Sequence, residues 1–324
     1  MDTAYLPGFF SIGGDFHRGY AQLNGGASPM YFEVIRRIVS AMGIPALNVI
    51  DWSNPANMAL LKQAYERLIQ NYQRATISQV FKNMNLSGNL DSGSVKAARY
   101  TNSVSQAYGT ARAAQVGVAL RERPVTVAIK ERREIVEEFE EFDSRTAPDY
   151  LREVISGRNQ DHAMTIARDT EYDFFQTARD EGTQLTTGPA VTGATPQDRL
   201  EGLILQLTTL KNDFFSGIDR NMIYVVMNDL TYSALRSQLN IGFQNANVNS
   251  AAENFNVING VTVFPTSYLP TDVNVMAMAR GAVAMPTLIL PYSTGEIQLS
   301  YARSLMTAFA LTATAVMPDT IFWA

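Results

Sequence analysis

Residues 134–182 decide the fold of this chain, and they read EIVEEFEEFDSRTAPDYLREVISGRNQDHAMTIARDTEYDFFQTARDEG. Ser144 or Thr146 can cap a helix that has Pro148 near its first turn. One helical face then carries Leu151, Val154, Ile155, His162, Ile166, Thr170, Phe174 and Ala178. The spacing predicts a helix over residues 147–182, about 50 Å long at 1.5 Å per residue. Because a compact chain of this size has a radius of gyration of about 20 Å, the helix would cross the whole molecule as a rod.

An acidic run precedes this helix, and its members are Glu134, Glu137, Glu138, Glu140, Glu141 and Asp143. Such carboxylates could act in pairs as acid and base, or hold a hard cation. Their spacing matches no calcium loop, and no glycine turn lies among them. We therefore favour a solvated face, or carboxylates that pair across a subunit contact with arginines at 132, 133, 145 and 152.

Residues 86–124 have a different character, because turn residues interrupt short alternating pieces at 95–100 and 116–120. The segment holds too few large apolar side chains for a core of its own. It predicts a long two-stranded hairpin that leans on another surface, since an isolated hairpin is marginal in water. Val125, Val127 and Ile129 alternate with small or polar residues and predict a half-buried strand directly after it.

The N-terminal residues 1–30 are rich in glycine and aromatic residues and predict an extended arm. Two helices should follow, one over 31–42 that stops at Gly43, and one that starts at Pro55 and runs to about Asn85.

The sequence predicts a compact α/β part from about Leu200 to Pro291. Its helices are expected over 199–215, ending at Gly217, and over 230–239, capped by Asn228. Its strands are expected over 222–227, buried on both faces, over 257–264 as a hairpin that turns at Asn259-Gly260, and over 273–278. After this part, strands are expected over 296–302 and 305–316, joined near Arg303-Ser304, and over 321–323.

Composition excludes several classes of protein. The 324 residues contain no cysteine, so a disulfide framework, a zinc ribbon and a thiol nucleophile are excluded. The net charge of -5 gives no general attraction to nucleic acid or anionic membranes. The sequence has no apolar run long enough for a membrane span and no secretory signal near Met1, so we expect a cytosol-like compartment.

No catalytic, cofactor-binding or metal-ligating residue emerges from the sequence. His17 and His162 are far apart, and His162 lies near Arg158 and Asp161 without a nucleophile beside it. We interpret it as a satisfied histidine on a helix face. Three features instead suggest a chain that buries its extended parts against copies of itself: the extended arm, the hairpin with few large apolar side chains, and the helix that is long for a compact domain.

The order of these parts resembles the major capsid protein of tailed bacteriophages, with the Hong Kong 97-type fold. The resemblance covers residues 86–324. The segment Ser94–Tyr100 with Tyr108-Gly109 looks like the extended E-loop of that family, and Glu137–Asp143 leads into its long spine helix. Ile223–Asn228 and the hairpin at Asn259-Gly260 are similar to its axial domain, and the strands over 297–303 and 305–317 look like its terminal strands.

The resemblance implies an α+β fold with an N-terminal arm (1–85), an E-loop hairpin (86–124), a peripheral domain with its spine helix (125–196), an axial domain (197–291) and terminal strands returning to the peripheral domain (292–324). It implies a structural protein, not an enzyme, that forms hexamers and pentamers of an icosahedral shell around double-stranded DNA. The expected partners are copies of itself, DNA bound non-specifically, and portal, scaffold or decoration proteins. Assembly in the host cytoplasm and a final place in the virion follow, with no cofactor and no membrane.

Two other functions stay open at this point. An encapsulin-type nanocompartment would share the fold and enclose an enzyme, and a soluble hydrolase would use the acidic run over 134–143. Some family members crosslink subunits through a lysine, for which Lys96 is the one candidate in the hairpin. If the hairpin lies on another subunit, deleting Asn89–Ala114 should leave a folded chain that cannot assemble. The two N-terminal helices match no shared pattern of the family.

Overall fold

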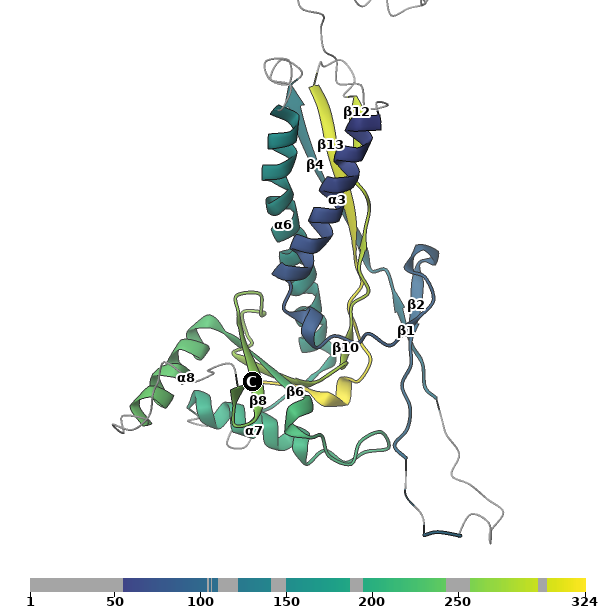
Figure 1. Cartoon of the computed structure of the whole chain (residues 1–324). Helices are drawn as coiled ribbons and strands as arrows, with labels where there is room; N and C mark the ends of the chain where they lie inside the picture. The colour runs from purple at the N-terminus through teal and green to yellow at the C-terminus, as the bar shows by residue number, and fades with distance from the viewer. Residues whose placement is uncertain are drawn as a thin grey trace, which may run out of the picture.

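The computed structural model describes residues 55–103, 105, 107–109, 122–140, 150–186, 195–242, 257–296 and 302–324. These residues form an elongated rod, a base built on a six-stranded sheet, and a small three-stranded sheet at the root of the hairpin (Figure 1). The arm and the first helix, predicted within residues 1–42, lie outside the described residues, and so does most of the hairpin tip.

The rod consists of two long helices on one face of a four-stranded sheet (Figure 1). The helices are α3 (Pro55–Ala75) and α6 (Tyr150–Glu181). The strands are β4 (Glu131–Glu140), β11 (Leu288–Ile289), β12 (Ser293–Glu296) and β13 (Ala302–Leu311). With 32 residues, α6 confirms the long helix predicted from the sequence and is about 48 Å long. The helix is followed by Gly182, where a side chain would not fit because a Cβ would lie 2.7 Å from Ile321 Cγ2.

Apolar residues from both helices and from β13 fill the rod. Leu68 of α3 and Ile166 of α6 are fully buried, and Leu305 and Phe309 face them from β13. Residues 305, 307, 309 and 311 all point to the helices because side chains alternate along a strand.

The base is a mixed sheet with strand order β5-β15-β9-β6-β8-β7. Its strands are β5 (Thr183–Gln184), β6 (Ile223–Asn228), β7 (Val257–Ile258), β8 (Val261–Thr266), β9 (Val275–Ala279) and β15 (Ile321–Trp323). Two helices, α7 (Pro196–Thr208) and α8 (Asp229–Gly242), pack against one face of this sheet. The end of α6 covers the other face.

Strand β6 is covered by helices on both faces of the base sheet. Val225 and Met227 pack toward α7, whereas Tyr224 and Val226 pack toward the end of α6. The prediction of a strand buried on both faces is therefore confirmed. The predicted turn at Asn259-Gly260 is also confirmed, with φ angles of 52° and 80° at the two residues.

The root of the hairpin is a sheet of β1 (Leu86–Ser87), β2 (Ser94–Ala97) and β3 (Val125–Ala128). A two-stranded sheet of β10 (Val283–Ala284) and β14 (Thr314–Ala315) lies against it. Short 3-10 helices, η1 to η4, connect the parts at Ser78–Val80, Leu90–Ser92, Arg220–Met222 and Pro318–Thr320.

Two predicted helices are shorter than expected. The helix from Pro55 ends at Ala75 instead of Asn85, and the Thr76 hydroxyl donates to the Tyr72 carbonyl where it stops. Helix α7 ends at Thr208 instead of Phe215, where the Thr208 and Thr209 hydroxyls both donate to the Leu205 carbonyl. Polar side chains that compete for backbone groups explain both early ends.

Two strands also differ from expectation. Four members of the acidic run, Glu134, Glu137, Glu138 and Glu140, belong to β4, a strand that the sequence did not predict. The turn expected at Arg303-Ser304 is wrong, since Arg303 pairs with Glu296 and with Phe139 inside the sheet. Strand β12 ends at Glu296 and β13 begins at Ala302, and β13 ends where Thr312 donates to the Pro286 carbonyl.

Candidate functional site

The hairpin leaves the body of the chain as two paired strands. Strands β2 and β3 are antiparallel, with Val95 opposite Val127, and a further bridge joins Tyr100 to Glu122. The Arg123 N–H donates to the Arg99 carbonyl at 2.8 Å. Farther out, Tyr108 is 97% exposed. Residues 110–121 lie outside the described part of the hairpin.

The root of the hairpin packs on its own chain. Leu90, Val95 and Val127 are buried in one cluster with Ala284 and Val316, which belong to the C-terminal half of the chain. The expectation that the segment from Asn89 onward finds its partners on another subunit is therefore wrong for the root. It stays a prediction for the residues beyond Ser103.

An arginine fastens the root to the base. The Arg99 guanidinium lies 3.6 Å from the centre of the Phe214 ring and 2.6 Å from Asp319. The Arg123 guanidinium faces the same ring at 5.5 Å. Three residues after Arg99, the Asn102 N–H donates to the Asp213 carbonyl at 3.0 Å. These contacts fix the direction in which the hairpin leaves the base.

Replacing Arg99 by alanine should loosen the root without unfolding the chain. The loss of one cation–π contact and one charged hydrogen bond predicts a destabilisation of about 1–3 kcal/mol. Limited proteolysis and hydrogen exchange of residues 99–103 should both become faster. The matched control is Arg168→Ala on the exposed side of α6, which should change neither. Equal effects of the two variants would contradict a fastening role for Arg99.

The structure separates the members of the acidic run. Glu137 points to α6, where its carboxylate accepts hydrogen bonds from Arg158 Nε at 2.8 and 3.1 Å. Glu134 and Glu138 are exposed on the opposite face of β4, because side chains alternate along a strand. Glu141 and Asp143 lie outside the described residues, and of Glu140 only the backbone is described. The described carboxylates are therefore not arranged as an acid–base pair.

His162 has partners that the sequence did not reveal. It is buried on α6, with Nδ1 2.9 Å from the Tyr292 hydroxyl. Its Nε2 lies 3.1 Å from Glu137 Oε2. Hydrogen bonding to Arg158 lowers the pKa of Glu137, while burial raises that of Tyr292. This chain of groups runs from the half-exposed Arg158 to the buried His162, and it links β4 to α6.

The arginines of β4 and α6 also pair within the chain. Arg133 Nη1 lies 2.9 Å from Asp169, and its Nε lies 3.0 Å from Glu131. The expectation that Arg133 pairs across a subunit contact is therefore corrected. These ion pairs line a groove of about 340 Å³ between β4 and α6, where Tyr172 forms part of the wall.

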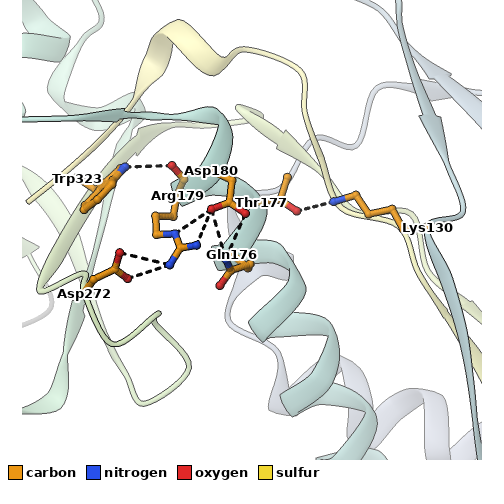
Figure 2. Close-up of polar contacts among 7 residues, drawn as sticks. All are labelled: Lys130, Gln176, Thr177, Arg179, Asp180, Asp272 and Trp323. Atoms are coloured by element: carbon orange, nitrogen blue, oxygen red, sulfur yellow. Dashed lines mark hydrogen bonds and ion pairs between the residues drawn. The ribbon is translucent and has the colours of Figure 1, made fainter.

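The end of α6 joins the rod to the base, as Figure 2 shows. Arg179 Nη1 lies 3.0 Å from Asp272 and its Nη2 lies 2.7 Å from Asp180. The Arg179 carbonyl accepts a hydrogen bond from Trp323 Nε1 at 3.1 Å. Arg179 holds the pKa of Asp180 below its usual range. One residue therefore connects the helix to a loop of the base and to β15.

The start of β4 is tied to the same helix. Lys130 Nζ donates to the Thr177 hydroxyl at 2.6 Å (Figure 2) and lies 3.8 Å from Asp173. Asp173 accepts a hydrogen bond from the Ala313 N–H at 3.0 Å. The rod, the base and the hairpin root therefore meet around the last turns of α6.

The remaining candidate residues form no catalytic or metal site among the described residues. Lys96 lies in β2 with an exposed side chain, opposite Thr126, and its crosslinking stays a prediction. His17 lies outside the described residues. Within the described ranges, no three carboxylates or histidines are grouped to hold a metal ion. No helix among them is long and apolar enough to cross a membrane.

Comparisons with solved structures identify the fold. Neither a protein-family model nor a curated protein matches this sequence. The capsid structure of the cyanophage P-SCSP1u is similar with a TM-score of 0.51 and 13% identity, over 76% of this chain and 87% of that one. The capsid of a native GTA particle has a TM-score of 0.51 and 14% identity, over 77% and 89% of the two chains. The capsid of an empty GTA particle has the same TM-score and coverage at 10% identity. The chain has the α+β Hong Kong 97-type capsid fold, as predicted.

Proposed function

We propose that this chain is a structural major capsid protein that assembles into hexamers and pentamers of an icosahedral shell around a double-stranded DNA phage genome. The observation that carries the proposal is its shape within a capsid fold. A helix of 32 residues runs along the rod, and beyond the root of the hairpin Tyr108 is 97% exposed. Parts that reach this far bury apolar surface most readily on further copies of the chain.

The proposal has consequences for partners and location. The first partner is a second copy of the chain, and the hairpin beyond Ser103 lies on that copy. DNA is held non-specifically, since a net charge of -5 favours only weak, salt-sensitive contacts. Portal and scaffold or decoration proteins complete the particle, which assembles in the host cytoplasm and becomes part of the virion. The chain is divided as the resemblance implies, with residues 125–196 peripheral and 197–291 axial.

Electron microscopy of the purified full-length chain tests the proposal. Closed shells of uniform size are the expected result, and after nuclease treatment those made in infected cells should retain double-stranded DNA. Shells that hold an enzyme and no DNA would identify a nanocompartment instead. A chain that remains monomeric at high concentration and at every salt concentration would contradict both forms of the proposal.

The Glu137→Gln variant separates a structural role of the acidic run from a catalytic one. Its carboxylate has a lowered pKa, so it stabilises the fold above its unfolded pKa and loses this effect as pH falls. Removal of the charge should therefore reduce the free energy of unfolding at pH 7 by about 1–3 kcal/mol. Denaturant titration measures this change. Glu138→Gln, on the exposed face, is the matched control and should stay within about 0.5 kcal/mol of the unmodified chain. A hydrolytic turnover that either variant abolished while shells still formed would favour the hydrolase.

A further inference from the structure

A short segment after α3 contacts both the rod and the base. Residues 76–83, here called the strap, run from the end of α3 toward the hairpin root. The Phe81 carbonyl accepts a hydrogen bond from the Gly281 N–H at 2.7 Å, and the Asn83 N–H donates to the Val283 carbonyl at 2.8 Å. The Phe81 ring packs against Phe174 of α6 and Phe264 of the base. The strap therefore contacts both parts of the molecule at their junction.

The strap is hydrogen-bonded to a buried carboxyl group of α6. Glu171 of α6 is 0% exposed, and its Oε1 accepts hydrogen bonds from the Ser78 N–H at 3.0 Å and the Ser78 hydroxyl at 2.5 Å. Its Oε2 is also buried and has no hydrogen-bond partner within the described residues. A carboxylate with one unpaired oxygen in such a place is costly when it is charged.

Two titratable groups among the described residues face Glu171. The first is Lys82 of the strap, which is 8% exposed and donates from Nζ to the Met285 carbonyl at 3.3 Å. The second is Tyr72 of α3, a buried phenol. The site therefore holds one carboxyl and one amine whose charges are both poorly solvated.

We propose that Glu171 and the strap form a proton-dependent joint between the rod and the base. When Glu171 takes up a proton, the packing of the strap on α6 becomes more stable. When Glu171 ionises, this packing becomes less stable. The joint is a property of the single subunit and does not depend on the proposed function.

The direction of the effect follows from the two pKa shifts. Burial raises the pKa of Glu171 to about 7 and lowers that of Lys82 to about 8. Protonated Glu171 therefore stabilises the fold at acidic pH, and this stability is lost as pH rises from the unfolded value of 4.5 to about 7. Neutral Lys82 stabilises the fold above pH 8 in the same way. The joint is weakest between pH 7 and 8, where both groups are charged and their attraction does not repay their desolvation.

Denaturant unfolding of the full chain at pH 7.5 and 5.5 tests the joint. In the unmodified chain, Glu171 should make the unfolding equilibrium constant about 20-fold smaller at the lower pH. Glu171→Gln, which keeps the shape of the protonated group, should lose this part of the pH dependence. The matched control is Glu66→Gln on the exposed side of α3, which should keep it. A Glu171→Gln variant with the full pH dependence would overturn the proposal.

Two further measurements keep the test valid if Glu171→Gln fails to fold. Hydrogen exchange in the unmodified chain, corrected for intrinsic rates, should show stronger protection of the amides of residues 78–83 at pH 5.5 than at pH 7.5. Lys82→Met removes the nearby positive charge, so the pH midpoint of the stability change should move upward. Unchanged protection or an unmoved midpoint would each contradict the joint. Both experiments use unassembled subunits, so the absence of shells would contradict the proposed function and leave this result intact.

Discussion

A subunit in which two glycines replace residues 104–120 should fold normally and form no shells. The cut keeps the bridge between Tyr100 and Glu122 and all the described contacts of Arg99. The removed residues lie beyond the root, and in the proposed function their partners belong to another copy of the chain. Circular dichroism and thermal unfolding should match the unmodified chain, while electron microscopy and sedimentation should show only small species.

The control for this prediction is a larger deletion. Removing Asn89–Ala114 was expected from the sequence to spare the fold, but it takes away Leu90 and Val95 from a buried cluster. It also removes Arg99, which holds the root against Phe214. The larger deletion should therefore unfold the hairpin root and lower the stability of the whole chain. Shells formed by the chain that lacks residues 104–120 would contradict an intermolecular role for the hairpin.

Phe81→Ala should cause the largest loss of stability among single substitutions at the junction of rod and base. The ring is 1% exposed, and its centre lies 5.5 Å from that of Tyr224 and 5.8 Å from that of Phe174. Truncation of a buried phenylalanine typically costs about 3–5 kcal/mol, because the cavity that remains closes only in part. A loss of this size is a large fraction of the stability of most domains.

Denaturant titration measures the effect of Phe81→Ala, and hydrogen exchange locates it. Exchange should accelerate in the strap and at the end of α6, before it does so at the far end of the rod. The adjacent residue offers a matched control, since Val80 is 50% exposed and Val80→Ala should change stability by less than about 0.5 kcal/mol. Similar losses in both variants would show that this ring does not hold the two parts together.

Local signals in the sequence were sufficient for several elements. Helix α6 follows from Pro148, from apolar spacing and from Gly182, and all of these act within a few residues of the helix. The turn at Asn259-Gly260 is equally local, because both residues tolerate positive φ angles. The double burial of β6 was visible as a continuous apolar run.

Strand β4 could not be predicted in the same way. Two of its positions that face the helices, Arg133 and Glu137, carry charges where an apolar residue is expected. Their partners on α6 neutralise them, so the usual alternation of apolar and polar residues disappears. The partners of His162 could not be predicted from the sequence for a related reason. Tyr292 lies 130 positions away, and only the packing of α6 on the sheet brings the two rings together.

Three arginines of the chain form ion pairs within the subunit. Arg133, Arg158 and Arg179 all pair with carboxylates of their own chain, at the contacts between helix, sheet and base. A planar guanidinium suits such fixed, bidentate contacts better than an ammonium group does. Arg132 is exposed on the free face of β4 and fits a contact between subunits.

The position of β15 has a consequence for the timing of folding during translation. This strand comes from residues 321–323, yet it lies between β5 and β9 inside the base sheet. While the ribosome is still making residues before 321, β9 therefore keeps an unpaired edge and the end of α6 lacks Ile321 and Trp323. Strand β4 likewise stays unpaired along the edge that faces β13 until β13 has been synthesised, more than 160 residues later. The base sheet of a nascent chain therefore stays incomplete until β15 has left the ribosome.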